Sequence, residues 1–166
     1  MTIEQFWNIV DRVHRASPGN MMQKSLLLGD ELRNLPAPEV KSFADHFDDC
    51  ADRAYTWELW AAAYIIGGGC SDDAFSDFRS TLISQGKETF ERVVAMPETL
   101  AEMEVDGESA FYEGYQYMAL TVYRRKTGQL PIRSKPQPED PAGTPWKEEA
   151  VAGLYPRLAK KHGFAG

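Results

Sequence analysis

The chain has 166 residues, of which 43% are apolar and 26% charged, and its formal net charge is −7. A chain of this length and composition forms one globular domain that needs neither a disulfide framework nor a structural metal. The acidic balance argues against a nucleic-acid partner, because a surface that neutralises phosphates must be basic. No apolar run is long enough to span a bilayer, and the N-terminus lacks the apolar core of a signal peptide. We therefore expect a cytoplasmic protein with no membrane partner.

Apolar residues recur every three to four positions along nearly the whole chain, which is the period of α-helices. Cap residues divide this pattern into separate helices. Thr2 and Asn20 are placed to cap a first and a second helix, and Pro38 fits the first position of a third. The next segment, Tyr55 to Ile66, is apolar on every side except at Glu58, and such a helix is expected in the centre of the core.

Gly67-Gly68-Gly69 ends this central segment, and Ser71 is placed to cap a following helix that ends near Gly86. Two shorter helices follow, separated by Pro97. The longest helix is predicted from Glu108 to Thr127, and it too should be largely enclosed.

Residues 130–145 contain five prolines and few apolar residues. Proline donates no backbone hydrogen bond, so this segment is predicted to be an extended strap. Residues 146–163 are again apolar enough to form one helix that docks on the body. Residues 1–166 are thus predicted to form an all-α single domain, a bundle of about eight helices with a Pro-rich strap and a C-terminal docking helix.

Several motifs follow one another from Trp57 to Gly86: Trp57-Glu58-Leu59-Trp60, then Gly68-Gly69-Cys70-Ser71-Asp72-Asp73, then Phe78-Arg79 and Leu82-Ile83. In this order they resemble the bacterial Domain of Unknown Function 4240 family. The similarity extends to Thr127-Gly128, with a weaker match at Trp146-Lys147-Glu148. One departure is Thr81, where the family pattern places Trp. The resemblance implies a helical bacterial domain and supplies no reaction.

The glycine turn leads into Ser71-Asp72-Asp73, for which three interpretations stay open. Ser71 can cap the helix while Asp72 and Asp73 complement the positive end of its dipole, which is a structural role. The same two carboxylates are weak candidates for binding a divalent metal or a cationic ligand. Free backbone N–H groups at the turn could instead hold an anion, although two carboxylates repel one.

A second group of candidates combines charges from three helices. Glu58 and Glu113 lie in segments that are otherwise apolar, and Arg79 borders the apolar face of the helix after the glycine turn. A buried carboxylate is costly unless it is paired, and a guanidinium can bind it with two hydrogen bonds. The group is either an internal ion-pair network or a polar pocket in which one acid stays available for a ligand. If Asp72 joins them, Arg79 cannot neutralise every acid, which favours a functional site.

Cysteine chemistry has less support. His46 and Cys50 share one helix face and Cys70 follows the glycine turn, but a zinc site needs a further ligand. Asp72 and Asp73 oppose a reactive thiolate at Cys70. We expect one aromatic stripe to pack in the core, and it consists of Trp57, Trp60 and Tyr64. Two histidines lie among polar residues and are expected to face water: His14 and His162.

Two functions from different classes remain. The favoured one is a non-enzymatic binding or regulatory module with an acidic pocket near the glycine turn, whose partner is a small cationic or polar ligand or another protein. The alternative is a metal-assisted hydrolase in which Asp72, Asp73, Glu58 and Glu113 supply oxygen ligands and Arg79 stabilises negative charge. No cofactor is predicted by a specific motif, although this alternative needs a divalent metal.

Overall fold

The computed structural model describes all 166 residues as one helical domain without strands. The predicted all-α single-domain fold is confirmed. The α-helices are α1 (Ile3–Ala16), α2 (Met21–Arg33), α3 (Ala37–Arg53), α4 (Trp57–Gly67), α5 (Asp72–Ser84), α6 (Lys87–Ala95), α7 (Met118–Thr127), α8 (Val151–Leu154) and α9 (Pro156–Lys161). Four short 3-10 helices join them: η1 (Pro97–Glu102), η2 (Ser109–Phe111), η3 (Tyr115–Tyr117) and η4 (Glu148–Ala150).

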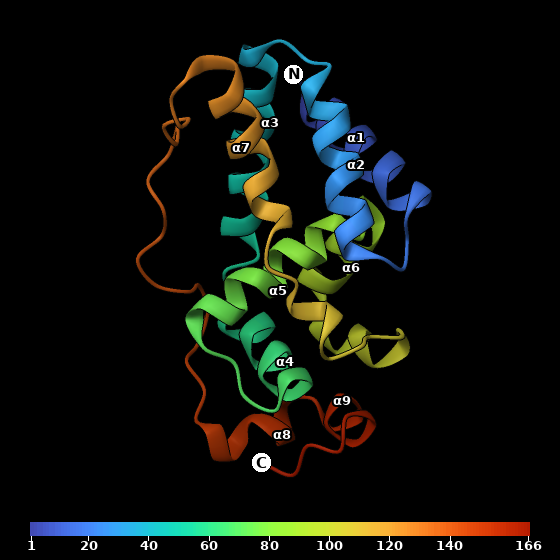
Figure 1. Ribbon diagram of the computed structural model, residues 1–166. Coiled ribbons are helices and arrows are strands. Elements are labelled where there is room, and N and C mark those ends of the chain that lie inside the picture. Colours follow the sequence, from blue (N-terminus) through green and yellow to red (C-terminus); the bar gives the residue numbers. More distant parts are fainter.

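The helices pack around α5, which crosses the middle of the molecule (Figure 1). On one side of it α7 packs against both α2 and α3, and α1 covers α2. On the other side α4 contacts α8, α9 and η1. Every residue of α5 from Phe78 to Ser84 is buried, so the C-terminal half of this helix is enclosed on all sides. No helix is both long enough and apolar enough to cross a membrane.

Local sequence signals define most helix ends. Thr2, Asn20 and Ser71 accept a hydrogen bond from the backbone N–H three residues later, so all three predicted caps are confirmed. Gly68 ends α4 in the left-handed conformation, with φ of 64°, which a residue with a side chain rarely adopts.

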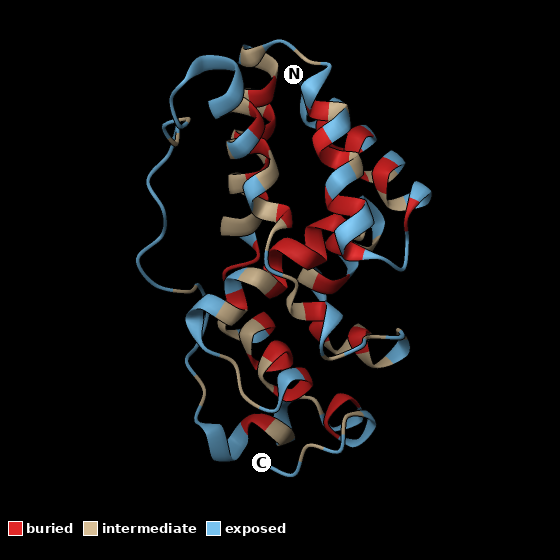
Figure 2. Cartoon of the chain, viewed as in Figure 1, coloured by how far each residue is buried: buried red, intermediate tan, exposed pale blue.

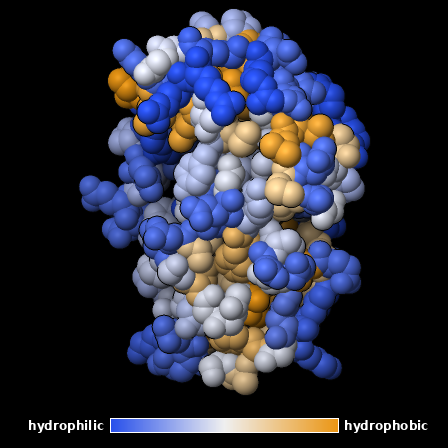
Figure 3. Space-filling model, viewed as in Figure 1, coloured by the Kyte–Doolittle hydropathy of each residue, from blue (hydrophilic) through white to orange (hydrophobic).

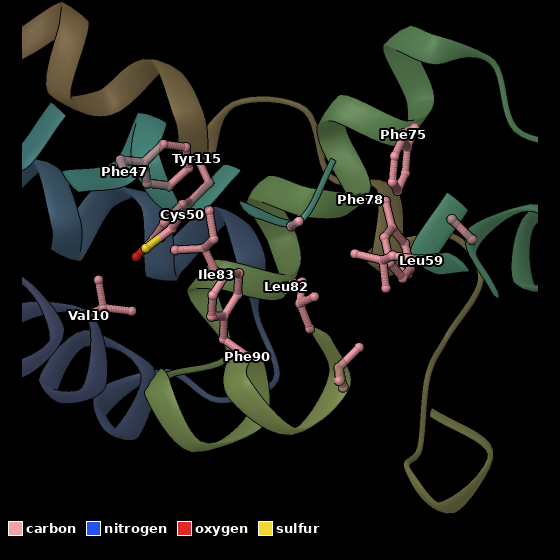
Figure 4. Packing of buried hydrophobic residues seen from close by; sticks show 14 of the residues in the cluster. Val10, Phe47, Cys50, Leu59, Phe75, Phe78, Leu82, Ile83, Phe90 and Tyr115 are labelled. Atoms are coloured by element: carbon pink, nitrogen blue, oxygen red, sulfur yellow. The ribbon is translucent and has the colours of Figure 1, made fainter. Parts of the chain in front are cut away.

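Buried apolar side chains form one continuous core, as a single domain requires. Figure 2 shows where the buried residues lie along the helices. Phe6 of α1 packs against Phe43 of α3 with ring centroids 4.8 Å apart, and Trp7 packs against Phe90 of α6. Figure 4 shows side chains of α3, α5 and η3 meeting in this core.

The predicted helix from Glu108 to Thr127 is wrong. Its first half is two 3-10 turns, η2 and η3, and only Met118–Thr127 is α-helical. Gly114, with φ of 137°, breaks the segment, and glycine is among the weakest helix formers. The break lets the ring of Tyr115 enter the core, where its side chain is 1% exposed. Tyr115 then packs near Phe47, with centroids 6.1 Å apart.

The single C-terminal helix predicted for residues 146–163 is also replaced by shorter pieces, η4, α8 and α9. Pro156 interrupts it, because the residue before a proline is driven out of the helical conformation, and Tyr155 has φ of −135°. The pieces nevertheless dock on the body. Val151 and Leu158 are completely buried, and the Trp146 indole donates a 2.7 Å hydrogen bond to the Trp57 carbonyl.

Residues 130–145, called the strap, run down the outer side of the molecule from the end of α7 towards α8 (Figure 1). They contain no helix, and nearly all are exposed (Figure 2). Most of the corresponding edge of the surface is hydrophilic, with an apolar spot near its upper end (Figure 3). The strap is fixed near its C-terminal end, where Ala142 donates to the Tyr55 carbonyl and accepts from the Trp57 amide, both at 2.9 Å.

A fully buried lysine lies between α1, α2 and α5. Lys24 is 0% exposed, its Nζ lies 3.0 Å from Nδ1 of His14, and it donates to the Ser84 carbonyl at 3.3 Å. No carboxylate pairs with it, and burial lowers the pKa of Lys24 to about 8. Burial, and then the Lys24 charge, lower the pKa of His14 as well. The expectation that His14 faces water is therefore wrong, since its ring is half-buried against this amine.

Lys24 makes stability depend on alkaline pH in a defined direction. The folded state holds the proton less tightly than the unfolded chain, whose lysine has the ordinary pKa of 10.5. The free energy of unfolding should therefore rise between about pH 8 and pH 10.5, by about 3 kcal/mol from this group alone. Lys24→Met should raise stability near pH 7 and remove this rise, as measured by urea denaturation at several pH values. An unchanged rise in the variant would show that other groups cause it.

Candidate functional site

Arg79 is buried, as its position on the margin of an apolar face suggests, but it contacts none of the expected carboxylates. It is 6% exposed, and its guanidinium carbon lies 4.5 Å from the centroid of the Tyr55 ring and 5.0 Å from that of Phe75. Its Nη1 donates a 2.8 Å hydrogen bond to the Ala51 carbonyl at the end of α3, and its Nε has no partner. Burial lowers the pKa of Arg79, although Tyr55 and then Asp72 oppose this.

The two glutamates of the expected network lie at the surface. Glu58 and Glu113 are both exposed, and neither makes an ion pair. The Glu58 carboxylate lies against Gly143 of the strap so closely that a Cβ would not fit there. Glu113 lies in the connection between η2 and η3, because the helix expected to hold it is broken. The expected ion-pair network with Arg79 is therefore absent.

The acids of the glycine turn have local partners. Ser71 accepts a hydrogen bond from the Ala74 amide at 3.2 Å, so it caps α5. Asp72 accepts from the Tyr55 hydroxyl at 3.1 Å, and the Tyr55 ring in turn stacks on Arg79. Asp73 is exposed beside them. This geometry fits the structural role of the turn, and no three His, Cys, Asp or Glu side chains of the chain are grouped as a metal site requires.

The cysteines lack the environment of reactive thiols. Burial raises the pKa of Cys50 and of Cys70 to about 12, so neither is a thiolate near neutral pH. The Nε2 of His46 lies 3.0 Å from the Met1 carbonyl, not at a shared ligand. In the aromatic stripe, Trp57 stacks on Trp60, and Trp146 from the C-terminal segment packs edge-on against both.

Arg79 does line a cavity, of about 300 Å³, which lies between α3, α5, η3 and the strap. Polar groups on one wall come from Arg79, Ser80 and Gln116, and on the other from Asp48 and Asp52. Ser80 donates to Gln116, and Gln116 donates to Asp77 at 2.7 Å, so this amide is held in place. The remaining wall is apolar, and it is formed by Phe43, Phe47, Tyr115, Ala119 and Leu120.

The strap covers this cavity and is held to α3 mainly by ion pairs. Arg133 places its Nε 3.0 Å from Asp48 and its Nη2 2.9 Å from Asp52, so one guanidinium joins two carboxylates of α3. Lys135 pairs with Asp49 at 2.8 Å. Burial raises the pKa of Asp48, although its hydrogen bond with Arg133 opposes the rise. The apolar neighbour Ile132 borders the cavity but is 84% exposed.

Sequence reasoning missed this group, although one signal was present. Four aspartates follow helical spacing along one face of α3: Asp45, Asp48, Asp49 and Asp52. Such a row usually indicates a solvated face. Its basic partners, Arg133 and Lys135, lie in the Pro-rich segment more than eighty residues later, and no local pattern connects the two.

The fold and the site together define an all-α domain with a partly polar cavity covered by an extended strap. Residues 1–125 match the sequence profile of the family described as Protein of unknown function (DUF4240), so the chain belongs to that family. The match includes α3, α5 and η3, which form the body of the cavity, and it ends before the strap. No curated protein and no solved structure matches the chain.

The packing of Arg79 predicts which substitutions affect stability. Arg79→Ala should lower the free energy of unfolding by about 2–4 kcal/mol, because it removes the stacking on two rings and leaves a void. Glu58→Gln and Glu113→Gln should each change it by less than about 0.5 kcal/mol, since both side chains are exposed. Urea denaturation of the three variants checks this. If Glu113→Gln lowered the free energy of unfolding as much as Arg79→Ala, this would contradict the exposed position of Glu113 and support an ion pair with Arg79.

Proposed function

We propose that the chain is a non-enzymatic binding module whose ligand occupies the cavity beneath the strap. The ligand presents a cationic nitrogen group to Asp48 and Asp52 and an apolar group to the adjoining wall. One observation carries this proposal: Arg133 already fills the position between the two carboxylates, and the adjoining cavity of about 300 Å³ has apolar side chains in its lining. The acidic pocket expected near the glycine turn is thus reassigned to α3.

The charges around the cavity support a cationic group. Among the cations that line it, Lys41 is engaged by Asp45 at 2.7 Å, and Arg79 stacks on aromatic rings. Arg133 is then the direct partner of both Asp48 and Asp52. A ligand that replaces Arg133 must neutralise these two carboxylates, because leaving partly buried charges unpaired is costly.

Binding is favoured over catalysis by the residues that line the cavity. They include no His and no Cys, and the Ser80 hydroxyl is engaged by Gln116. A hydrolase needs a nucleophile next to a base, or a metal held by several ligands. The acids assigned to the metal-assisted alternative, Glu58, Asp72, Asp73 and Glu113, are all exposed and are not grouped.

The test uses a small molecule that combines the two expected groups, Nα-benzoyl-arginine amide. The full chain carrying Arg133→Gln, which vacates the ionic position, should bind it about tenfold more tightly than the unsubstituted chain in isothermal titration calorimetry. Adding Asp48→Asn and Asp52→Asn should remove that gain.

The matched control is Nα-benzoyl-citrulline amide, which has nearly the same shape without the charge. It should bind at least about tenfold more weakly than the arginine compound. Equal binding of the two compounds, or no binding of either to the Arg133→Gln chain, would contradict the proposed function.

A further inference from the structure

We infer that the partner for this cavity is an extended basic segment of another polypeptide, and that the strap occupies the path of that segment within its own chain. This inference rests on the proposed function, since it names the source of the cationic group. The structure provides both an observed mode of binding and a reason why the present occupant can be displaced.

The strap is attached to the body in the way a bound peptide is, through side-chain contacts along an extended segment. Residues 130–141 make no backbone–backbone hydrogen bond, so only side-chain contacts fix them between the end of α7 and the pairing at Ala142. Four prolines in this stretch restrict the backbone to extended conformations, which lowers the entropy lost on binding. An extended chain with prolines at similar positions in a partner would follow the same route.

The spacing of the basic residues fits the acidic face of α3. Arg133 and Lys135 are two residues apart, and the chain bends at Ser134 and Lys135 so that both side chains reach the same face of α3. They reach Asp48, Asp52 and Asp49. The residue between them is also bound, because the Ser134 amide donates to Asp45 at 3.4 Å and the Ser134 hydroxyl accepts from Lys41 at 2.9 Å.

The strap nevertheless fills only the ionic part of the site. Its large apolar residues, Ile132 and Leu130, are 84% and 59% exposed, so neither is buried in the cavity, although Ile132 borders it. Arg79, which is 94% buried and lines the same cavity, keeps an Nε without a partner. A segment with an apolar side chain directed inward adds contacts with the apolar part of the cavity lining.

Because the strap leaves part of the cavity unoccupied, a segment of another polypeptide can compete with it. A tethered occupant has an effective concentration in the millimolar range, which favours the strap. Its ion pairs are partly exposed, with 29% of the Arg133 side chain and 69% of Lys135 accessible, and such pairs contribute little. Burying one additional large apolar side chain increases affinity about 10- to 100-fold, which offsets the advantage of the tether.

The experiment measures fluorescence anisotropy of a labelled peptide with the sequence of residues 129–138, Gln-Leu-Pro-Ile-Arg-Ser-Lys-Pro-Gln-Pro. The full chain carrying Arg133→Gln and Lys135→Gln should bind this peptide at least about tenfold more tightly than the unsubstituted chain. Asp48→Asn with Asp52→Asn, added to that variant, should abolish the gain. A full chain carrying Arg124→Gln and Arg125→Gln, exposed residues of α7, changes the net charge equally and should show no gain.

Each other outcome has a defined meaning. Equal binding to the unsubstituted chain and to the Arg133→Gln, Lys135→Gln variant would overturn occupancy of the site by the strap. If benzoyl-arginine amide binds as proposed and the peptide shows no gain with the Arg133→Gln, Lys135→Gln variant, this inference fails and the proposed function stands. If neither binds, both fail. A peptide of the same composition with Arg and Lys separated by five residues should bind less tightly, and equal binding would overturn the match of spacing.

Discussion

The guanidinium of Arg79 lies where α3, α4 and α5 meet. It stacks on Tyr55 just before α4 and on Phe75 of α5, and it donates to the Ala51 carbonyl near the end of α3. Arginine stays charged under all ordinary conditions, so this corner carries a permanent positive charge within an apolar setting. The position of α5 against the end of α3 depends on these contacts, and with it the cavity between the two helices. Because no acid neutralises Arg79 directly, the nearby Asp48 and Asp52 can be held by a different cation.

That cation comes from a segment attached in a different way from the rest of the fold. The helices are joined by a continuous apolar core, whereas the strap is joined to α3 by ion pairs and has its apolar residues in water. Apolar burial is not weakened by charge screening, while partly exposed ion pairs weaken as ionic strength increases. The strap is therefore the part of this structure whose position depends most on its chemical surroundings. In the proposed function, binding at the cavity and release of the strap are one coupled event.

The sequence predicted features that depend on near neighbours and missed those that depend on distant ones. The capped starts of α1 and α5 follow from Thr2 and Ser71, whose bonding partners are three residues away. The burial of Tyr115 against α3, which the break at Gly114 permits, is revealed by no local periodicity. Arg79 was placed correctly beside an apolar face. Arg79 contacts two aromatic rings and a backbone carbonyl instead of carboxylates, and these contacts depend on how the helices pack together.

The central claim is that a ligand with adjoining cationic and apolar groups enters the cavity between α3 and α5. Isotope-filtered NMR of Nα-benzoyl-arginine amide bound to the Arg133→Gln chain tests it most directly, since it reports which protein protons lie near the ligand. The account predicts nuclear Overhauser contacts from the benzoyl ring to the rings of Phe47 and Tyr115, which line that cavity. Contacts only to residues outside the cavity, such as those of the glycine turn, would contradict it.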